Sequence, residues 1–411
     1  MKFRLLAAAA FAAPIAFAQP AFAAPGDAIP VSDSLSIDPI AEGRLRYEYV
    51  DQPATNADAL TMRLRGGLEV KHASGLSVLA EAEGTLALID DYNAFPFAIA
   101  DSQRRTQYSV VPDPMNIDLN RLQLQYKAEA VAVTLGRQRI NLDDQRWVGS
   151  VAWRQNEQTF DAVRGEAKLG PVNLDAIYSN SQRTIFGVDA GPRQALDGDF
   201  FLGGAALKLG PVQAKGFAYL LDYEDPFYLT NSSQTYGVRL VAPVPIAEGV
   251  KLNLTGSYAK QSDYGDNPFD YSADFISAEG ALGIKGFVLT GGWELLGSDN
   301  GQAVQTPLAT LHKFNGWADM FLTTPGTGLQ DAYGGIAYAF TGVKALPGLN
   351  AAVMFHQYDS DVGDIEYGTE WNASVGFKLG RVGVLAKYAN YKAASYSVDT
   401  EKFWLQAEFA Y

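Results

Sequence analysis

Strict alternation of apolar and polar residues over Leu60–Lys71 is the feature that most restricts how this chain can fold. The stretch reads LTMRLRGGLEVK, with Leu, Met, Gly and Val at even positions and Thr, Arg, Gly, Glu and Lys at odd positions. A helix would scatter these residues around its circumference, whereas a period of two sorts them onto opposite faces of a strand. Strands in soluble domains usually have about 5–6 residues, and a tilted strand crosses a bilayer with roughly 9–11. A single strand of this kind also fits a soluble sandwich.

The same alternation returns along the whole chain, and short connections alternate with long polar ones. The long connections are roughly residues 90–114, 139–157, 181–198 and 298–328. Short turns at one rim and long loops at the other are typical of transmembrane β-barrels. Counting gives about 18 strands, expected near residues 40–49, 60–71, 76–87, 118–127, 130–138, 159–168, 172–180, 199–208, 212–222, 234–242, 250–260, 274–284, 287–296, 330–340, 349–359, 367–378, 382–391 and 401–411.

The sequence therefore predicts an all-β fold: a single transmembrane antiparallel β-barrel with short periplasmic turns and long extracellular loops. Only a closed barrel satisfies every backbone amide of such strands in hydrocarbon. Alternate residues of each strand, which we call its two parities, then face different surroundings: the apolar parity faces lipid, and the polar parity lines the lumen. Aromatic residues near strand ends on the apolar parity, such as Tyr47, Tyr126 and Tyr258, suit the interfacial girdles of such a barrel.

The N-terminus predicts export. Lys2 and Arg4 precede an apolar stretch, and Ala21-Phe22-Ala23 forms a small-x-small cleavage signal, so residues 1–23 are expected to be a secretory signal peptide. An anchor helix fits less well because the apolar stretch is short. Residues 24–36 would form a short periplasmic segment and residues 37–411 the barrel in the outer membrane. Removing the leader, which carries two cationic and no anionic residues, takes the formal net charge from −14 to −16.

The last strand ends on Tyr411, as in the assembly signal of bacterial outer-membrane barrels. The expected partners are therefore the lipid bilayer and the outer-membrane assembly machinery. Cysteine is absent and the three histidines, His72, His312 and His356, lie far apart in the sequence, so a metal site is not expected. No glycine-rich phosphate loop follows a strand, and no basic face suits a nucleic acid. We expect neither a cofactor nor a nucleic-acid partner.

Cations are frequent on the polar parity of the first third of the chain. Adjacent strands bring such positions within several ångströms of one another, and guanidinium groups bind carboxylates or phosphates bidentately. Five glutamates share this parity, so an anion-selective constriction and a mixed, weakly selective lumen are both open. The candidate pore-lining cations here are Arg44, Arg46, Arg63, Arg65, Arg121 and Lys127.

The densest polar segment is residues 136–164, GRQRINLDDQRWVGSVAWRQNEQTFDAVR. Strict alternation would place Arg137 on the lipid face, so a bulge or an exit into the loop is expected there. The segment is either a well-paired outer loop stapled to the barrel wall or a constriction lined by guanidinium groups. Its candidate cations are Arg137, Arg139, Arg146, Arg154 and Arg164.

Two blocks of the sequence resemble the alginate-export family of outer-membrane channels. The resemblance implies an 18-stranded monomeric barrel whose lumen Arg and Lys residues guide a polyuronate by its carboxylates. By position in the first block, Arg137, Arg146 and Arg164 are the family-like cations. The first block is Gly136-Arg137-Gln138, Asp144-Gln145-Arg146, Val148-Gly149, Trp153, Asn156, Phe160-Asp161 and Arg164; the second is His312, Phe314, Gly316-Trp317-Ala318-Asp319, Thr324-Pro325, Gly328-Leu329 and Asp331.

We therefore predict a non-enzymatic channel that passes anionic sugars or other organic anions down a gradient. The alternative is a weakly selective diffusion porin for small solutes, and a structural or adhesive barrel fits less well. A barrel hydrolase would need a histidine beside an acid. The candidates for such a pair are His356 with Asp359 or Asp361, and His312 with Asp319.

Overall fold

The alternating stretch Leu60–Lys71 lies within strand β3 (Asn56–His72), which pairs antiparallel with β2 (Leu35–Asp51) along its full length. The computed structural model describes residues 28–411, so the predicted signal peptide lies outside the described residues. No helix in this described part is long and apolar enough to cross a membrane.

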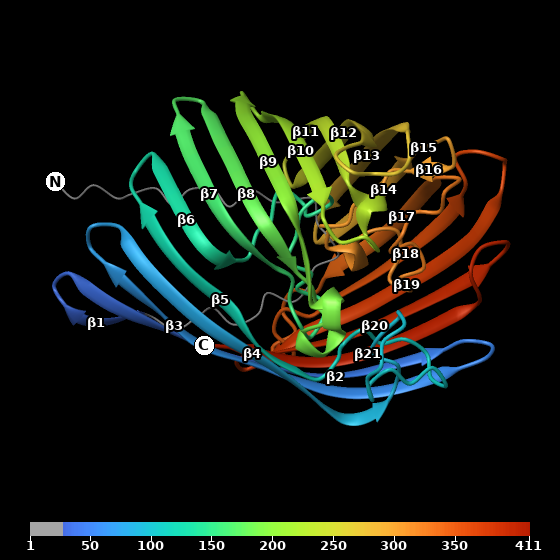
Figure 1. Ribbon diagram of the computed structural model, residues 1–411, viewed down its shortest axis with the longest axis horizontal. Coiled ribbons are helices and arrows are strands. Elements are labelled where there is room, and N and C mark those ends of the chain that lie inside the picture. Colours follow the sequence, from blue (N-terminus) through green and yellow to red (C-terminus); the bar gives the residue numbers. More distant parts are fainter. Residues whose placement is uncertain (1–27) are drawn as a thin grey trace.

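Eighteen antiparallel strands form one closed ring, which confirms the predicted architecture (Figure 1). The last strand, β21 (Thr400–Ala410), closes the ring by pairing with β2 from Asp51↔Glu401 to Glu42↔Ala410. Between β3 and β21 the ring consists of β4 (Leu76–Asp91), β5 (Asn116–Lys127), β6 (Val131–Gln138), β7 (Thr159–Leu169), β8 (Val172–Arg183), β9 (Ala195–Leu209), β10 (Val212–Tyr223), β11 (Ser233–Ala247), β12 (Val250–Asp263), β13 (Ser272–Ile284), β14 (Phe287–Leu296), β17 (Leu329–Ala339), β18 (Asn350–Asp359), β19 (Glu366–Leu379) and β20 (Val382–Ala393).

The remaining elements are short. Strand β1 (Ile29–Ser32) folds back on the start of β2, inside the segment predicted to precede the barrel. A small hairpin of β15 (Ser298–Asp299) and β16 (Gln302–Ala303) and three 3₁₀ turns, η1 (Val188–Gln194), η2 (Leu229–Asn231) and η3 (Leu311–Lys313), lie in the loops.

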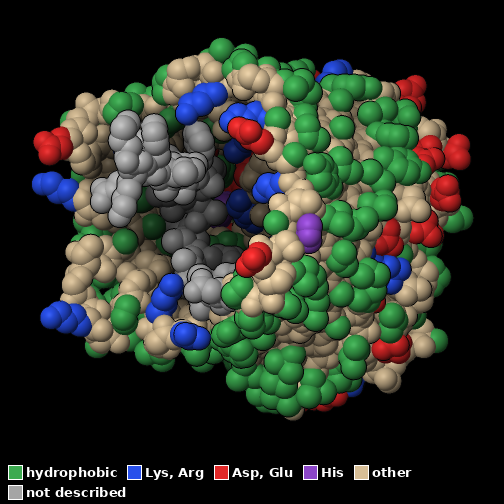
Figure 2. Space-filling model, turned by 90° about the vertical axis from the view of Figure 1, so that its left-hand side faces the viewer, with side chains coloured by type: hydrophobic (Ala, Val, Ile, Leu, Met, Phe, Trp, Pro, Cys, Tyr) green, Lys and Arg blue, Asp and Glu red, His purple; other side chains and the backbone are tan. Residues whose placement is uncertain are grey.

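The two parities of each strand face different surroundings, as the alternation predicts. On β3, Leu64 is 50% exposed, whereas its neighbours Arg63 and Arg65 are 1% and 6% exposed. Figure 2 looks toward the rim of short turns and shows hydrophobic side chains covering much of the outer wall, with charged side chains around the mouth. The apolar face is the one that a bilayer would cover.

The rim of short turns is built largely from hairpins with very few connecting residues. Gly170 and Gly210 each open a two-residue turn with φ of 60°, a backbone conformation that glycine adopts without a steric penalty. One connection at this rim, residues 340–349, is longer than the prediction of uniformly short turns implies. The other rim carries the long connections 92–115, 139–158, 184–194 and 297–328.

Two of the long connections fold into the lumen and pack against each other. We call residues 139–158 the first inward loop and residues 297–328 the second inward loop. The amide of Gly149 donates to the carbonyl of Leu308 at 2.8 Å, and the amide of Thr310 donates to the carbonyl of Gln145 at 3.1 Å. Their apolar side chains form the main hydrophobic cluster together with inward residues of the wall. The core of this protein therefore lies inside the barrel.

Candidate functional site

Four buried arginines on β2 and β3, Arg44, Arg46, Arg63 and Arg65, form what we call the arginine wall. Glu408, on the last strand, binds two of them: it receives two hydrogen bonds from Arg44, at 3.0 and 3.1 Å, and one from Arg63 at 2.9 Å. Sequence parity placed these arginines in the lumen, and their burial agrees with that placement. Their charges are already matched by carboxylates of the barrel.

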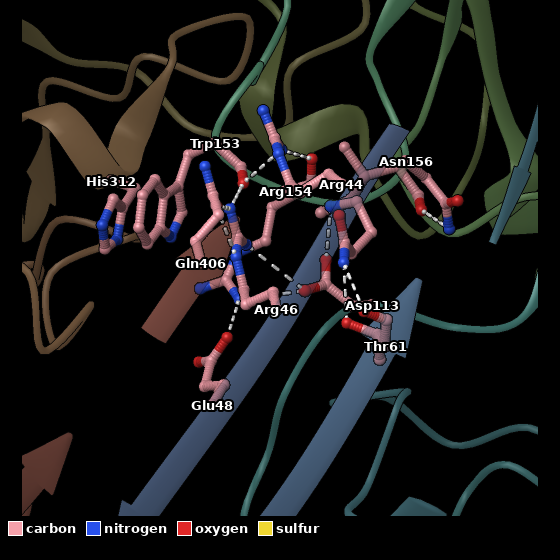
Figure 3. Close-up of polar contacts among 12 residues, drawn as sticks. Arg44, Arg46, Glu48, Thr61, Asp113, Trp153, Arg154, Asn156, His312 and Gln406 are labelled. Carbon is pink, nitrogen blue, oxygen red and sulfur yellow. Dashed lines mark hydrogen bonds and ion pairs between the residues drawn. The ribbon is translucent and has the colours of Figure 1, made fainter. Parts of the chain in front are cut away.

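The arginine wall also holds the first inward loop through its backbone. One guanidinium nitrogen of Arg44 donates to the carbonyl oxygens of Ala152, Trp153 and Arg154, at 3.0–3.1 Å. Arg46 donates to the carbonyl of Trp153 and lies 4.0 Å over the centroid of its ring (Figure 3). Arg44 and Arg46 thus fasten the loop, and all four guanidinium groups are buried and do not stand free in an open passage.

A second network joins the strands to the end of the same loop. Glu157 lies 3.3 Å from Arg65 and is hydrogen-bonded to Arg139. Glu81 accepts from Arg121 at 2.6 and 2.9 Å and from Arg139 at 3.1 Å. Burial disfavours the ionised form of Glu157, but the positive charges of Arg139 and Arg65 outweigh burial and lower the pKa of Glu157 below its usual range. These ion pairs thus attach the end of the first inward loop to the barrel wall.

Two further predicted cations are anchors within the inward loops. Arg154 lies 2.6 Å from Asp319 of the second inward loop and 3.3 Å from Glu48 on β2. Arg146 makes a bidentate contact with Glu294 on β14, at 2.8 and 3.0 Å. Across the lumen, the tip of the first inward loop makes two more ion pairs: Lys215 to Asp143 at 2.7 Å and Arg239 to Asp144 at 2.9 Å.

Arg137 lies on the outer face of the barrel, and the bulge expected to turn it inward is absent. It stands opposite Leu122, which is 49% exposed, and opposite Asp161 on β7, in regular register with both. Its guanidinium binds the Asp161 carboxylate at 2.8 and 3.1 Å. This partner on the next strand satisfies the charge without moving it into the lumen. The placement of Arg137 in the pore is therefore corrected.

The last two predicted cations lie away from both inward loops. Arg164 faces inward on β7, opposite the buried Thr134, and pairs with Asp175 at 2.5 Å. Lys127 is exposed where β5 ends at the rim of short turns, and its amide donates to the carbonyl of Gly75.

Lys387, a buried lysine on β20, is not among the cations predicted from sequence. Its ammonium nitrogen lies 2.7 Å from Nε2 of His312, and 3.9 and 3.8 Å from the ring centroids of Trp153 and Trp317. The signal that could have found it was a lysine in the middle of the strand predicted over residues 382–391, at alternating positions to Val382, Val384 and Tyr388.

His312 links Lys387 to the inward loops. Its Nδ1 lies 2.7 Å from Asp319, and its ring stacks on Trp153 with centroids 4.5 Å apart. Burial lowers the pKa of His312 well below its usual range, although Asp319 opposes this. His312 therefore pairs with the acid predicted from sequence, whereas His356 pairs with Asp331 at 2.9 Å and not with the acids that follow it.

A cavity in the lumen is lined by neither strand of the arginine wall. It measures about 360 Å³ and is bounded by the inner faces of β10–β14 and β17–β20 and by both inward loops. Of the eleven predicted pore-lining cations, only Arg146 lines it. Its other charged residues are of both signs: Asp143, Asp144, Arg239, Glu279, Glu294, Lys313, Asp331 and Lys387, with His312 and His356. Among residues 28–411, no group of His, Cys, Asp or Glu side chains is arranged to hold a metal ion.

A closed 18-stranded barrel with an apolar outer face, a charged interior and loops folded into the lumen is an outer-membrane β-barrel of the porin type. Comparison with protein families then gives a match to the alginate export family over residues 61–186, from β3 to the loop after β8. This confirms the resemblance seen in the first sequence block. The second block lies outside the matched residues.

Solved structures show the same fold. OpdQ of Pseudomonas aeruginosa has a TM-score of 0.69 at 16% identity, covering 91% of this chain and 97% of that one. OpdK of the same organism, solved with vanillate, has a TM-score of 0.68 at 16% identity, covering 91% and 98%. OccAB3 of Acinetobacter baumannii has a TM-score of 0.67 at 15% identity, covering 91% and 100%. No curated protein sequence matches the chain.

Proposed function

We propose that this barrel is a passive, non-enzymatic channel for small organic solutes with only a weak preference for charge. The observation that carries the proposal is that the arginine wall and the cavity are separate parts of the lumen. Arg44 and Arg46 of the arginine wall fasten the first inward loop, while the cavity is lined by charges of both signs, most of them paired. Selectivity in a pore follows from the width of the passage and from the charges that line it.

A channel for anionic sugars or other organic anions is the second candidate. Lys313 and Lys387 line the cavity and make no carboxylate ion pair within residues 28–411. The alginate export match and the solved complex of OpdK with vanillate favour this candidate as well. Both ammonium groups have other partners, the Asp144 carbonyl and the His312 ring, so the first proposal agrees better with the geometry.

Reversal potentials across planar bilayers in a KCl gradient separate the two candidates. A weakly selective channel gives a chloride-to-potassium permeability ratio near one, and this ratio stays the same when Arg63 and Arg65 are both replaced by Ser. A strong chloride preference that the double variant loses would overturn the proposal in favour of the anion channel. Solute uptake into proteoliposomes, compared among uronates, neutral sugars and aromatic acids, then gives the permeant class.

We propose no hydrolase activity because His312 is enclosed. Its ring is 5% exposed, with Trp153 stacked on one face and both ring nitrogens occupied by Asp319 and Lys387. A nucleophilic hydroxyl would need one of those nitrogens as its base. Lipid and peptide hydrolysis assays on the purified protein should show no turnover.

We also propose that the barrel acts as a monomer and that its last strand is read by the outer-membrane assembly machinery. Support for the second point is the position of Tyr411, whose amide donates to the carbonyl of Ala41 at the end of the closing seam. Deleting Tyr411 should lower the yield of assembled barrel in cells without changing the refolded protein.

A further inference from the structure

The wall of the cavity carries a group of hydroxyls on three neighbouring strands. Ser257 on β12 stands directly opposite Ser277 on β13, and Thr255 stands opposite Glu279. Thr290 adds a third strand, β14, and all five residues line the cavity. Directly opposite residues have Cβ atoms about 4.5–5.5 Å apart. The two pairs are adjacent on one face of β12 and β13, and Thr290 on β14, opposite Ala281 on β13, is diagonal to Glu279.

These hydroxyls are available to a solute. Within residues 28–411 the side chains of Thr255, Ser277 and Thr290 make no hydrogen bond, and Ser257 receives only a 3.4 Å contact from Arg239. All four residues are partly exposed. A hydroxyl can donate one hydrogen bond and accept two. An incoming polar group would meet both donors and acceptors here.

The charged groups of the cavity are, by contrast, mostly occupied. Arg146 is paired with Glu294, and Arg239 with Asp144. His356 is likewise paired with Asp331. A solute that binds through its own charge would have to break one of these pairs, whereas one that binds through hydroxyl groups would not.

Three charged groups of the cavity make no ion pair within residues 28–411: Lys313 and Lys387, whose ammonium groups contact the Asp144 carbonyl and the His312 ring, and Glu279. Of these, Glu279 would repel anions. It makes no ion pair within the described residues and is only partly buried. Tyr333 holds it in place with a hydrogen bond of 2.9 Å, and the Tyr333 ring occupies the space beside Gly292, where a Cβ would lie 2.3 Å from the ring. A fixed carboxylate accepts hydroxyl donors strongly. It also disfavours a second carboxylate at the same place.

Partly exposed aromatic side chains, Phe314 and Trp317 of the second inward loop, supply an apolar part of the lining. A cyclic sugar has apolar C–H faces and an edge of hydroxyls, and this cavity offers both an apolar surface and a hydroxyl surface. Its volume of about 360 Å³ is at the small end of the range for ligand sites. We propose that the cavity binds an uncharged, polyhydroxylated ring of monosaccharide size, with Glu279 and the β12–β14 hydroxyls as the groups that recognise it. This inference rests on the proposed function, of which it names the substrate class.

The test is current block of single channels in planar bilayers by glucose and by glucuronate, which differ in one carboxylate. We expect glucose to block the current in a saturable way and glucuronate to block it more weakly. Ser277→Ala should weaken the glucose block about five- to tenfold, as expected for the loss of one hydrogen bond. Glu279→Gln should weaken the glucose block and strengthen the glucuronate block, because the repelling charge is gone.

Ser77→Ala is the matched control. Ser77 is a buried lumen hydroxyl on β4 outside the cavity, so its loss should leave the glucose block unchanged. If Glu279→Gln fails to assemble, the glucose block of Ser277→Ala still tests the inference, and an unchanged block would contradict it. A conducting channel that glucose does not block, or that glucuronate blocks as tightly as glucose, overturns the inference and leaves the proposed function standing. A barrel that forms no conducting pore overturns both.

Discussion

Arg44 and Glu408 stand directly opposite each other on β2 and β21, the two strands that close the barrel, and their side chains form two hydrogen bonds of 3.0 and 3.1 Å. The same carboxylate accepts from Arg63 at 2.9 Å. One buried acid on the last strand therefore contacts two buried arginines, on β2 and β3, and Glu42 on β2, 3.5 Å from Arg63, supplies a second negative charge. The pairing joins the ends of the chain, so it supports ring closure as well as charge balance.

Glu408→Gln should destabilise the barrel strongly. The substitution leaves Arg44 and Arg63 buried next to a neutral amide, and breaking a buried pair in this way costs about 3–5 kcal/mol. The measurement is urea unfolding in lipid vesicles, followed by the heat-dependent shift of the folded band in gels. Glu401→Gln, an exposed position on the same strand, is the control and should change the free energy of unfolding by less than about 0.5 kcal/mol. Equal unfolding curves for the two variants would contradict the role given to Glu408.

Arg146→Met should loosen the second anchor of the first inward loop. Arg146 binds Glu294 twice and also donates to Thr306 and Asn315 at 3.0 and 3.2 Å. Without these contacts the loop tip can leave the wall, so we expect more frequent fluctuations of the open-channel current and a higher mean conductance. Arg164→Met is the control, because Arg164 is a lumen arginine that lies away from both inward loops. It should leave the current fluctuations and the mean conductance as in the wild type.

The strands could be predicted from sequence because the signal is local. Alternation over Leu60–Lys71 needs only neighbouring residues, and β3 indeed contains that stretch. The strand ends were less predictable. β2 begins at Leu35, five residues before the predicted start, because pairing with β3 continues where the apolar and polar residues no longer alternate cleanly.

The site was less predictable because it depends on contacts between distant segments. Lumen placement of Arg44 and Arg63 followed from parity, but nothing in the sequence shows that backbone carbonyls of residues 152–154 occupy Arg44. Every residue has a backbone carbonyl, so residue types do not show which carbonyls will accept a hydrogen bond. The outward placement of Arg137 was unpredictable for the same reason, since its partner Asp161 lies on a neighbouring strand 24 positions away.

His312 should make the stability of the barrel depend on pH. In the folded protein, burial holds the pKa of His312 well below the value of about 6.5 that it has when unfolded. The unfolded chain therefore binds the extra proton first. The contribution of neutral His312 to the free energy of unfolding is complete above the unfolded-state pKa. It decreases as the pH falls from there toward the lowered pKa of the folded protein, by up to about 1.4 kcal/mol per pH unit. Protonation would also place a second positive charge 2.7 Å from the ammonium of Lys387.

The measurement is the urea midpoint at pH 7.5 and at pH 5 for the wild type and for His312→Gln. Other groups that face this site, Asp319 and Arg154, are present in both proteins, so the difference between the two pH dependences isolates the histidine. We expect the wild type to lose more stability than the variant. His72→Gln, an exposed histidine beside a short turn, is the control and should behave as the wild type does. Parallel pH dependences in all three proteins would remove His312 from this role.

Asp161→Asn should reveal the cost of an arginine on the outer face. Arg137 lies one residue from the loop-side end of β6, and an arginine facing lipid costs about 0–1 kcal/mol near the interface against about 2–4 at the midplane. We therefore expect a loss of about 1 kcal/mol in Asp161→Asn, since Asp118 still lies 3.7 Å from Arg137. Replacing both Arg137 and Asp161 by Leu should restore the wild-type free energy of unfolding in vesicles, because the apolar pair suits a lipid-facing position. If the double variant is instead less stable than either single variant, the pair does not face the membrane as the register places it.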